Sequence, residues 1–263
     1  MSAPVLPHLG VHLRLLSELV RRDVRSRFAG SRFGLLWSLL NPLLQIVSYG
    51  LIFGFVYRGG GDVPRGVFVA TLFCGLWPWW AFQEGVTRGM SALVDQAPLL
   101  KKMPIPPAFC VVSQVAGSAL LQATGFLVFL WLFGMLGIVE LSPRLASIPF
   151  AACLGAALAA GFGLLLAPLF LVVRDTAHVV NALLTLLFFA SPVLYRIESL
   201  PPAVQRLARW NPVAGVIDLY RAIVMGEPVS TASIAYLLVF VGVVAGAGAS
   251  VLRTLEPVLD EYL

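Results

Sequence analysis

Long apolar stretches, separated by short charged segments, take up most of the chain. A helix needs about 20 apolar residues to cross the roughly 30 Å of hydrocarbon in a bilayer. We expect six transmembrane helices, over residues 33–57, 66–88, 108–139, 145–173, 176–195 and 230–252. Helices of soluble proteins rarely run so far without a charge. The pattern predicts an all-α membrane protein in which residues 1–263 form a single transmembrane domain.

Residues 9–29, before the first apolar stretch, show a different pattern. Apolar side chains recur every three or four residues, which lines one face of a helix, and arginines occupy the rest. The arginines of interest are Arg21, Arg22 and Arg25. Such an amphipathic helix lies in the membrane interface. It is either a plain topology anchor or an anchor that also docks a phosphate or a protein partner, and we favour the second.

Two further segments do not fit a simple span. Residues 95–107 are rich in proline and carry Leu99 and Leu100 beside Lys101 and Lys102, which predicts a short, exposed element that anchors a partner protein. Residues 196–227 are mostly apolar but contain scattered charges, and two short helices broken at Asn211-Pro212 fit them best. Apolar segments of that length more often re-enter the membrane than span it. We therefore expect a gate at the outer face.

Composition and charge set the orientation. Hydrophobic residues make up 59 % of the chain and charged residues 12 %, so no soluble catalytic domain fits between the spans. With six spans both termini lie on one side of the membrane, and most of the positive residues gather on that side. The positive-inside rule places it in the cytoplasm. The net charge of +5 therefore reflects topology and not binding to nucleic acid.

The chain lacks the usual motifs of enzymes and ion-coupled carriers. Its three histidines are not at metal-ligand spacing, so we expect no metal site. Gly59-Gly60-Gly61 is not followed by the Lys-Ser/Thr of a phosphate-binding loop, so any ATP would bind another subunit. Charges within the spans are too few for a proton relay. Arg174-Asp175 stands at an inner turn, where it serves either structural pairing or coupling.

A cluster of aromatic residues stands out in the second apolar stretch: Trp77, Trp79, Trp80 and Phe82. The apolar faces of sugar rings pack well on such side chains, so these residues could line a path for a glycan. Tryptophan is also common at membrane interfaces and in packing. The sequence leaves both readings open.

Several ordered motifs resemble those of type-2 ABC exporter permeases. They are Leu19-Val20-Arg21-Arg22-Asp23 with Ala29-Gly30-Ser31, Gly34-Leu35-Leu36-Trp37 before Asn41-Pro42, Gly75-Leu76-Trp77-Pro78-Trp79, Leu99-Leu100-Lys101-Lys102-Met103-Pro104, Arg174-Asp175, Phe188 to Tyr195 around Ser191-Pro192, and Trp210-Asn211-Pro212 with Tyr220-Arg221. They run in order over residues 19–221, and the resemblance is greatest to permeases that export O-antigen, capsule or teichoic-acid polymers. Ala29 and the order Met103-Pro104-Ile105 depart from the family pattern.

The resemblance implies a homodimer in the bacterial cytoplasmic (inner) membrane with two copies of a nucleotide-binding subunit. ATP and magnesium would bind those subunits, and this chain would hold no cofactor and be no enzyme by itself. A lipid-linked glycan would pass between the two permease subunits.

The resemblance also assigns roles to segments. Residues 95–104 would be the coupling helix, including Leu99, Leu100, Lys101, Lys102 and Pro104. Residues 9–29 would flank the entrance, with Arg21, Arg22 and Arg25 facing a pyrophosphate head group. Residues 197–222 would be the periplasmic gate, with Asn211, Pro212, Tyr220 and Arg221. Two alternatives remain: a type-2 permease for drugs or other small amphiphiles, and an ATP-independent channel, carrier or membrane enzyme.

Overall fold

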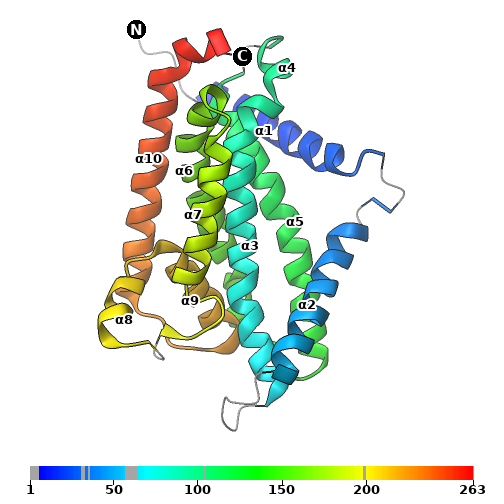
Figure 1. Ribbon diagram of the computed structural model, residues 1–263. Coiled ribbons are helices and arrows are strands. Elements are labelled where there is room, and N and C mark those ends of the chain that lie inside the picture. Colours follow the sequence, from blue (N-terminus) through cyan, green and yellow to red (C-terminus); the bar gives the residue numbers. More distant parts are fainter. Residues whose placement is uncertain are drawn as a thin grey trace.

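The computed structural model describes residues 6–30, 33–34, 36–56, 64–103, 105–197 and 200–262. Every regular element in these ranges is a helix (Figure 1). In chain order the helices are α1 (Leu6–Arg27), α2 (Leu36–Val56), α3 (Arg65–Asp95), α4 (Ala97–Leu100), α5 (Pro107–Met135), the 3-10 turn η1 (Pro143–Ser147), α6 (Ile148–Val172), α7 (Thr176–Ala190), α8 (Pro202–Ala208), α9 (Pro212–Met225) and α10 (Thr231–Tyr262).

Helix α3 is the centre of the bundle and packs against α5, α6 and α9. Small residues let the helices approach closely: a Cβ atom at Gly89 of α3 would lie 3.0 Å from the Cα of Gly163 in α6. Aromatic side chains fill the space between α3 and α5, where Phe73 and Trp77 pack on Phe129 with ring centroids 5.7 and 6.3 Å apart. Small side chains at crossings are typical of helix packing in membranes.

The two ends of the bundle differ. Helices α1 and α4 lie at the end of the bundle where α10 ends, and α1 runs across the bundle (Figure 1). Helices α8 and α9 lie toward the opposite end. The arginine-rich helix and the predicted coupling segment are therefore on one side of the molecule and the predicted gate is on the other.

Three segments within the described ranges are long and apolar enough to span a membrane: Pro107–Met135, Pro143–Val172 and Thr231–Glu256. Helix α7 is apolar but has 15 residues, about 22 Å at 1.5 Å per residue. Helix α3 is long enough but contains Glu84 and Arg88. The described residues therefore confirm a helical fold with apolar helices long enough to span a membrane. The number of six spans stays a prediction.

Several helices end at positions other than those predicted, for local reasons. Helix α7 stops at Ala190 and not at 195, because Pro192 disfavours a helical Ser191. Helix α5 stops at Met135 and not at 139, and Gly137 follows with φ of 67°, the usual glycine C-cap. Helix α3 continues past 88 to Asp95. Glu84 and Arg88 find partners in α1 and α5, so they do not end the helix.

Candidate functional site

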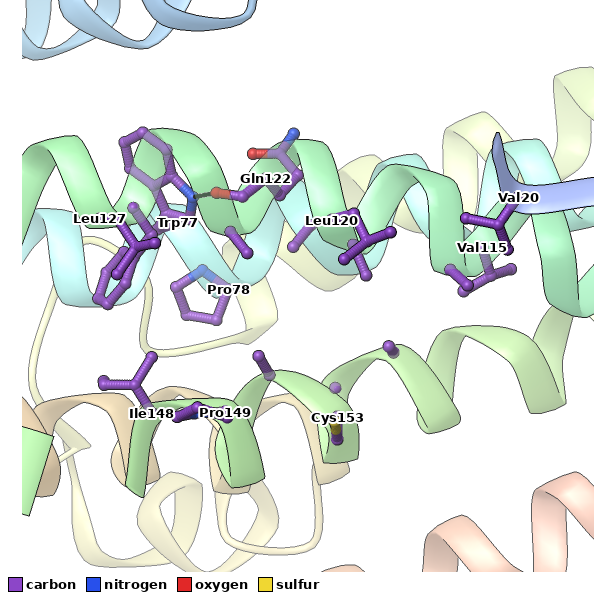
Figure 2. A pocket seen from close by; sticks show the side chains of 18 of the residues that line it. Val20, Trp77, Pro78, Val115, Leu120, Gln122, Leu127, Ile148, Pro149 and Cys153 are labelled. Carbon is purple, nitrogen blue, oxygen red and sulfur yellow. Dashed lines mark hydrogen bonds between the residues drawn. The ribbon is translucent and has the colours of Figure 1, made fainter. Parts of the chain in front are cut away.

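A long groove lies between α5 and α6, with α3 as its floor, and we call it the α5–α6 groove. Its volume is about 1120 Å³. Helix α1 borders it at one end, and η1 and α9 border it at the other. Figure 2 shows Val20 of α1 near one end and Trp77 of α3 near the other, with α5 and α6 facing each other between them. Nearly all of the lining side chains are apolar.

Two arginines provide charge at the α1 end of the groove. Arg21 and Arg25 are one helical turn apart and both line it, together with Leu16, Val20 and Val24. Both arginines are exposed. No ion pair within the described ranges includes either of them. A phosphate or carboxylate could therefore be bound here with charge-assisted hydrogen bonds.

The third arginine predicted to face a head group, Arg22, is not among the groove-lining residues. It is exposed on α1. The helical spacing separates it from Arg21 and Arg25, because residues i and i+4 share a face and residue i+1 does not.

Aromatic side chains close the far end of the groove. Phe126 of α5 meets Tyr220 of α9 edge to face, with ring centroids 5.0 Å apart, and Trp77 of α3 packs on Phe126 at 5.9 Å. The indole Nε1 of Trp77 donates a hydrogen bond to the backbone carbonyl oxygen of Gln122 at 2.9 Å. The end of the groove is therefore a packed aromatic wall shared by three helices.

The four aromatic residues predicted to line a glycan path divide into two pairs. Trp77 and Phe82 line the groove, although both are buried. Trp79 packs on Phe82 and Phe188, and Trp80 packs on Tyr49 of α2, so neither is among the groove-lining residues. On α3 the groove is lined by Trp77, Pro78, Ala81 and Phe82, which share one face of the helix and leave Trp79 and Trp80 for packing elsewhere.

Four charged side chains join α1 to α3. Arg27 Nη1 donates to Glu84 Oε1 at 2.8 Å, and its Nη2 and Nε donate to Asp23 Oδ2 at 2.8 and 3.0 Å. Arg88 Nη2 donates to Asp23 Oδ1 at 2.5 Å. Asp23 is only 7 % exposed. Two carboxylates and two guanidinium groups balance one another, which makes their burial tolerable.

The same charge network reaches α5 and the groove. Arg27 Nη2 also donates to Ser118 Oγ at 2.8 Å, and Gln122 Nε2 donates to Glu84 Oε2 at 2.7 Å. Because the carbonyl of Gln122 accepts from Trp77, polar contacts run from α1 to the aromatic end of the groove. The network fixes α1 in position, which sets the direction of Arg21 and Arg25.

Only part of this network can be seen in the sequence. Asp23 with Arg27, and Glu84 with Arg88, are opposite charges four residues apart within one helix, which is a visible signal. Their pairing across helices depends on where α1 crosses α3 and α5, and the spacing alone does not give that crossing.

Arg221 of α9 holds the turn that follows α7. Its side chain is buried, and Nη2 donates to the backbone carbonyl oxygens of Pro192, Val193 and Tyr195 at 2.8, 3.4 and 3.3 Å. One guanidinium group therefore satisfies several backbone carbonyls of a non-helical segment. The neighbouring Tyr220 is buried on the groove side of the same helix.

Asn211 begins helix α9 and ties it to the same turn. Its Oδ1 accepts from the backbone N–H of Val213 at 3.0 Å, which makes it the N-cap, and Pro212 follows at the first helical position. Its Nδ2 donates to Ser191 Oγ at 2.8 Å. The break predicted at Asn211-Pro212 separates α8 from α9 in the structure.

Gly75 of α3 is required where this turn crosses the helix. A Cβ atom there would lie 2.3 Å from the carbonyl oxygen of Val193 and 3.2 Å from Arg221 Nη2. We expect Gly75→Ala to lower the thermal unfolding temperature of the detergent-purified protein, because overpacking costs about 1–3 kcal/mol. Gly242→Ala is the control, since its Cβ would meet nothing within 4 Å. Equal melting of the two variants would contradict the assigned close approach.

The predicted coupling segment, 95–104, contains the short helix α4 and a turn at the α1 end of the bundle. Leu99 and Leu100 are half-buried against a cluster to which α1, α3, α5, α6 and α10 contribute. Lys101 and Lys102 are exposed, as is the following Met103. Pro104 lies outside the described residues. The structure thus presents the lysines outward while the leucines hold the turn on the bundle.

The turn between α6 and α7 carries Arg174 and Asp175, both exposed. The guanidinium carbon of Arg174 lies 5.2 Å from the ring centroid of Phe170, a cation–π contact. Asp175 is the N-cap residue of α7. The ion pairs found in the described residues do not join the two side chains.

The described part of the chain offers no group of three or more His, Cys, Asp or Glu residues that could hold a metal ion. Of the three cysteines, Cys74 and Cys110 are buried and Cys153 is exposed in the α5–α6 groove. The site is therefore an apolar groove with cationic and aromatic ends, suited to binding and passage.

Comparison with known proteins adds to this geometry. A family model described as ABC-2 type transporter matches residues 14–225. The O-antigen export system permease protein RfbA of Myxococcus xanthus is 32 % identical over 225 residues, covering 80 % of this chain and 79 % of its own. RfbA of Klebsiella pneumoniae is 28 % identical, covering 93 % and 92 %. The polysialic acid transport protein KpsM of Escherichia coli is 27 % identical, covering 92 % and 93 %.

Proposed function

The chain belongs to the ABC-2 type transporter family, and we propose that it is the permease subunit of an ATP-driven exporter of lipid-linked polysaccharide. The cargo we propose is an O-antigen or capsular glycan, moved across the bacterial cytoplasmic (inner) membrane. The permease provides the path, and a separate subunit hydrolyses ATP.

One observation carries this proposal. Relatives that align over most of their own length and most of this chain are named for the export of O-antigen or the transport of polysialic acid. These cargoes are polysaccharides, which favours polysaccharide export over the export of drugs or other small amphiphiles. An ATP-independent channel or carrier is also disfavoured, because the family is that of ABC transporters.

The proposed assembly is a homodimer of six-span subunits with both termini in the cytoplasm and two nucleotide-binding subunits below. Apolar side chains support a further interface in the membrane: Val179, Leu183 and Leu186 form an exposed stripe along α7 at helical spacing. Helix α2 likewise exposes Leu44 and Val47. These faces could meet membrane lipid or a second copy of the chain.

Each end of the bundle has a proposed role in transport. The turn at 95–104 would receive the movement of the nucleotide-binding subunit, and its exposed Lys101 and Lys102 suit docking on an acidic surface. Arg174 and Asp175 face the same side and would contribute to coupling. At the other end, residues 197–222 would open as the gate. Arg221 and Asn211 bind the 191–195 turn to α9, so these elements would move as one unit.

A deletion in the native cell tests the function. We expect loss of the gene to remove the polysaccharide from the cell surface and to leave lipid-linked polysaccharide on the cytoplasmic side. Immunoblotting of whole cells and of separated membranes measures both, and the gene supplied on a plasmid should restore export. Drug susceptibility is the control and should not change. Unchanged surface polysaccharide, with raised drug susceptibility, would favour the export of small amphiphiles instead.

A further inference from the structure

We infer that the α5–α6 groove holds the hydrocarbon anchor of the lipid-linked substrate, with the phosphate of that anchor between Arg21 and Arg25. This inference rests on the proposed function and adds the place where the lipid part is bound. It separates the path of the lipid from that of the glycan.

The groove has the shape of a trough for a long chain. Small side chains widen it where α5 and α6 face each other: Ala116, Ala119 and Ala123 on α5, and Ala152 and Ala156 on α6. The lining of α5 extends from Val115 to Leu130, which is about 22 Å along a helix. That length covers most of the roughly 30 Å of a bilayer's hydrocarbon. An extended hydrocarbon chain therefore fits along it.

The charge at the α1 end matches a phosphate. The described lining residues include Arg21 and Arg25 and no aspartate or glutamate. Asp23, the acidic residue between them in sequence, is turned to Arg27 and Arg88 on the other side of α1. The guanidinium groups are therefore left to bind an anion, and arginine binds phosphate well because it presents paired donors.

The orientation also agrees with a lipid in the inner leaflet. The arginines lie at the end of the bundle that carries α1 and α4, which we assign to the cytoplasm (Figure 1). The apolar trough runs from there to Val216 and Tyr220 of α9. A bound lipid would thus have its phosphate in the cytoplasmic interface and its tail against α9. This helix is joined to the 191–195 turn by Asn211 and Arg221.

A second copy of the chain is a weaker candidate for this groove. The exposed stripes of α2 and α7 do not line it, so they remain available for a dimer interface. The arginines would also have to be buried in an apolar contact, which is costly without an acidic partner.

Photo-crosslinking in nanodiscs tests the inference. The full-length chain, purified with its associated subunits, is placed in phosphatidylcholine nanodiscs with a long-chain polyprenyl phosphate that carries a diazirine in its tail. Mass spectrometry then maps the labelled peptides. We expect labelling of α5 and α6 around Leu120 and Cys153 to exceed that of the exposed Val239 and Val243 on α10. Unlabelled polyprenyl phosphate should compete, and an equal amount of phosphatidylglycerol should not.

Paired variants test the role of the arginines. Arg21→Gln/Arg25→Gln should reduce labelling of the groove about tenfold, as expected from losing charge-assisted hydrogen bonds. Arg14→Gln/Arg253→Gln is the matched control, because these arginines are exposed and do not line the groove. It should label like the wild type.

Three results would overturn the inference: equal labelling of α10 and the groove, equal competition by phosphatidylglycerol, or unchanged labelling of Arg21→Gln/Arg25→Gln. The second would identify the occupant as an ordinary membrane phospholipid. Surface polysaccharide is scored separately in the deletion strain, so a failed lipid site and a failed export function give different results.

Discussion

Replacing Arg27 by Met is expected to remove most of the protein from the membrane fraction. Arg27 contacts Asp23, Glu84 and Ser118, and it is the side chain that joins α1 to both α3 and α5. Its loss leaves Glu84 without its cationic partner and Asp23 with Arg88 alone. Breaking a buried ion pair by removing one partner costs about 3–5 kcal/mol, a large part of the stability of a typical domain.

Membrane accumulation and the unfolding temperature of the purified protein measure this effect. Arg14→Met is the control, because Arg14 is exposed on the same helix and belongs to no ion pair in the described structure. Arg27→Met/Glu84→Gln should recover part of the loss, since it removes the unpaired carboxylate. If Arg27→Met accumulates and melts like Arg14→Met, the network does not hold α1 in place.

The two faces of α1 have different roles because the charge network holds only one of them against the bundle. Arg27 and Asp23 face the bundle and fix the helix, whereas Arg21 and Arg25 line the groove. These residues are close in sequence, and only their angular positions on the helix separate a structural arginine from one that can bind a ligand. The sequence predicted the amphipathic helix at 9–29 and a head-group site at Arg21, Arg22 and Arg25. It did not predict the structural role of Arg27.

Local signals in the sequence were sufficient at the break between α8 and α9. The Asn-Pro pair at 211–212 predicted a break between two short helices, and it forms the N-cap and first residue of α9. Asparagine caps and N1 prolines depend on neighbouring backbone only, so they can be recognised without a structure. The partners of Arg221 could not be recognised, because the turn at 191–195 comes from a distant part of the chain.

The sequence does not predict which neighbouring helix each side chain of α3 contacts. Trp77, Trp79, Trp80 and Phe82 appear as one aromatic cluster in sequence, yet α3 is surrounded by other helices and directs them to different neighbours. The span predicted over 66–88 ends at Arg88, whereas α3 runs through Glu84 and Arg88 to Asp95. An apolar pattern predicts that a helix exists, and tertiary partners decide which charges it can carry.

Charge reversal at the coupling turn is expected to abolish export. Lys101 and Lys102 are exposed beyond α4, while Leu99 and Leu100 hold the turn on the bundle, so Lys101→Glu/Lys102→Glu should leave folding unchanged. Like charges across a docking surface cost several kcal/mol, and each 1.4 kcal/mol is a tenfold change in affinity, so we expect export to fall by at least about tenfold.

Surface polysaccharide in the complemented deletion strain measures export, and membrane accumulation measures folding. Lys101→Arg/Lys102→Arg keeps the charge and should export normally. Normal export by Lys101→Glu/Lys102→Glu would show that the nucleotide-binding subunit docks elsewhere.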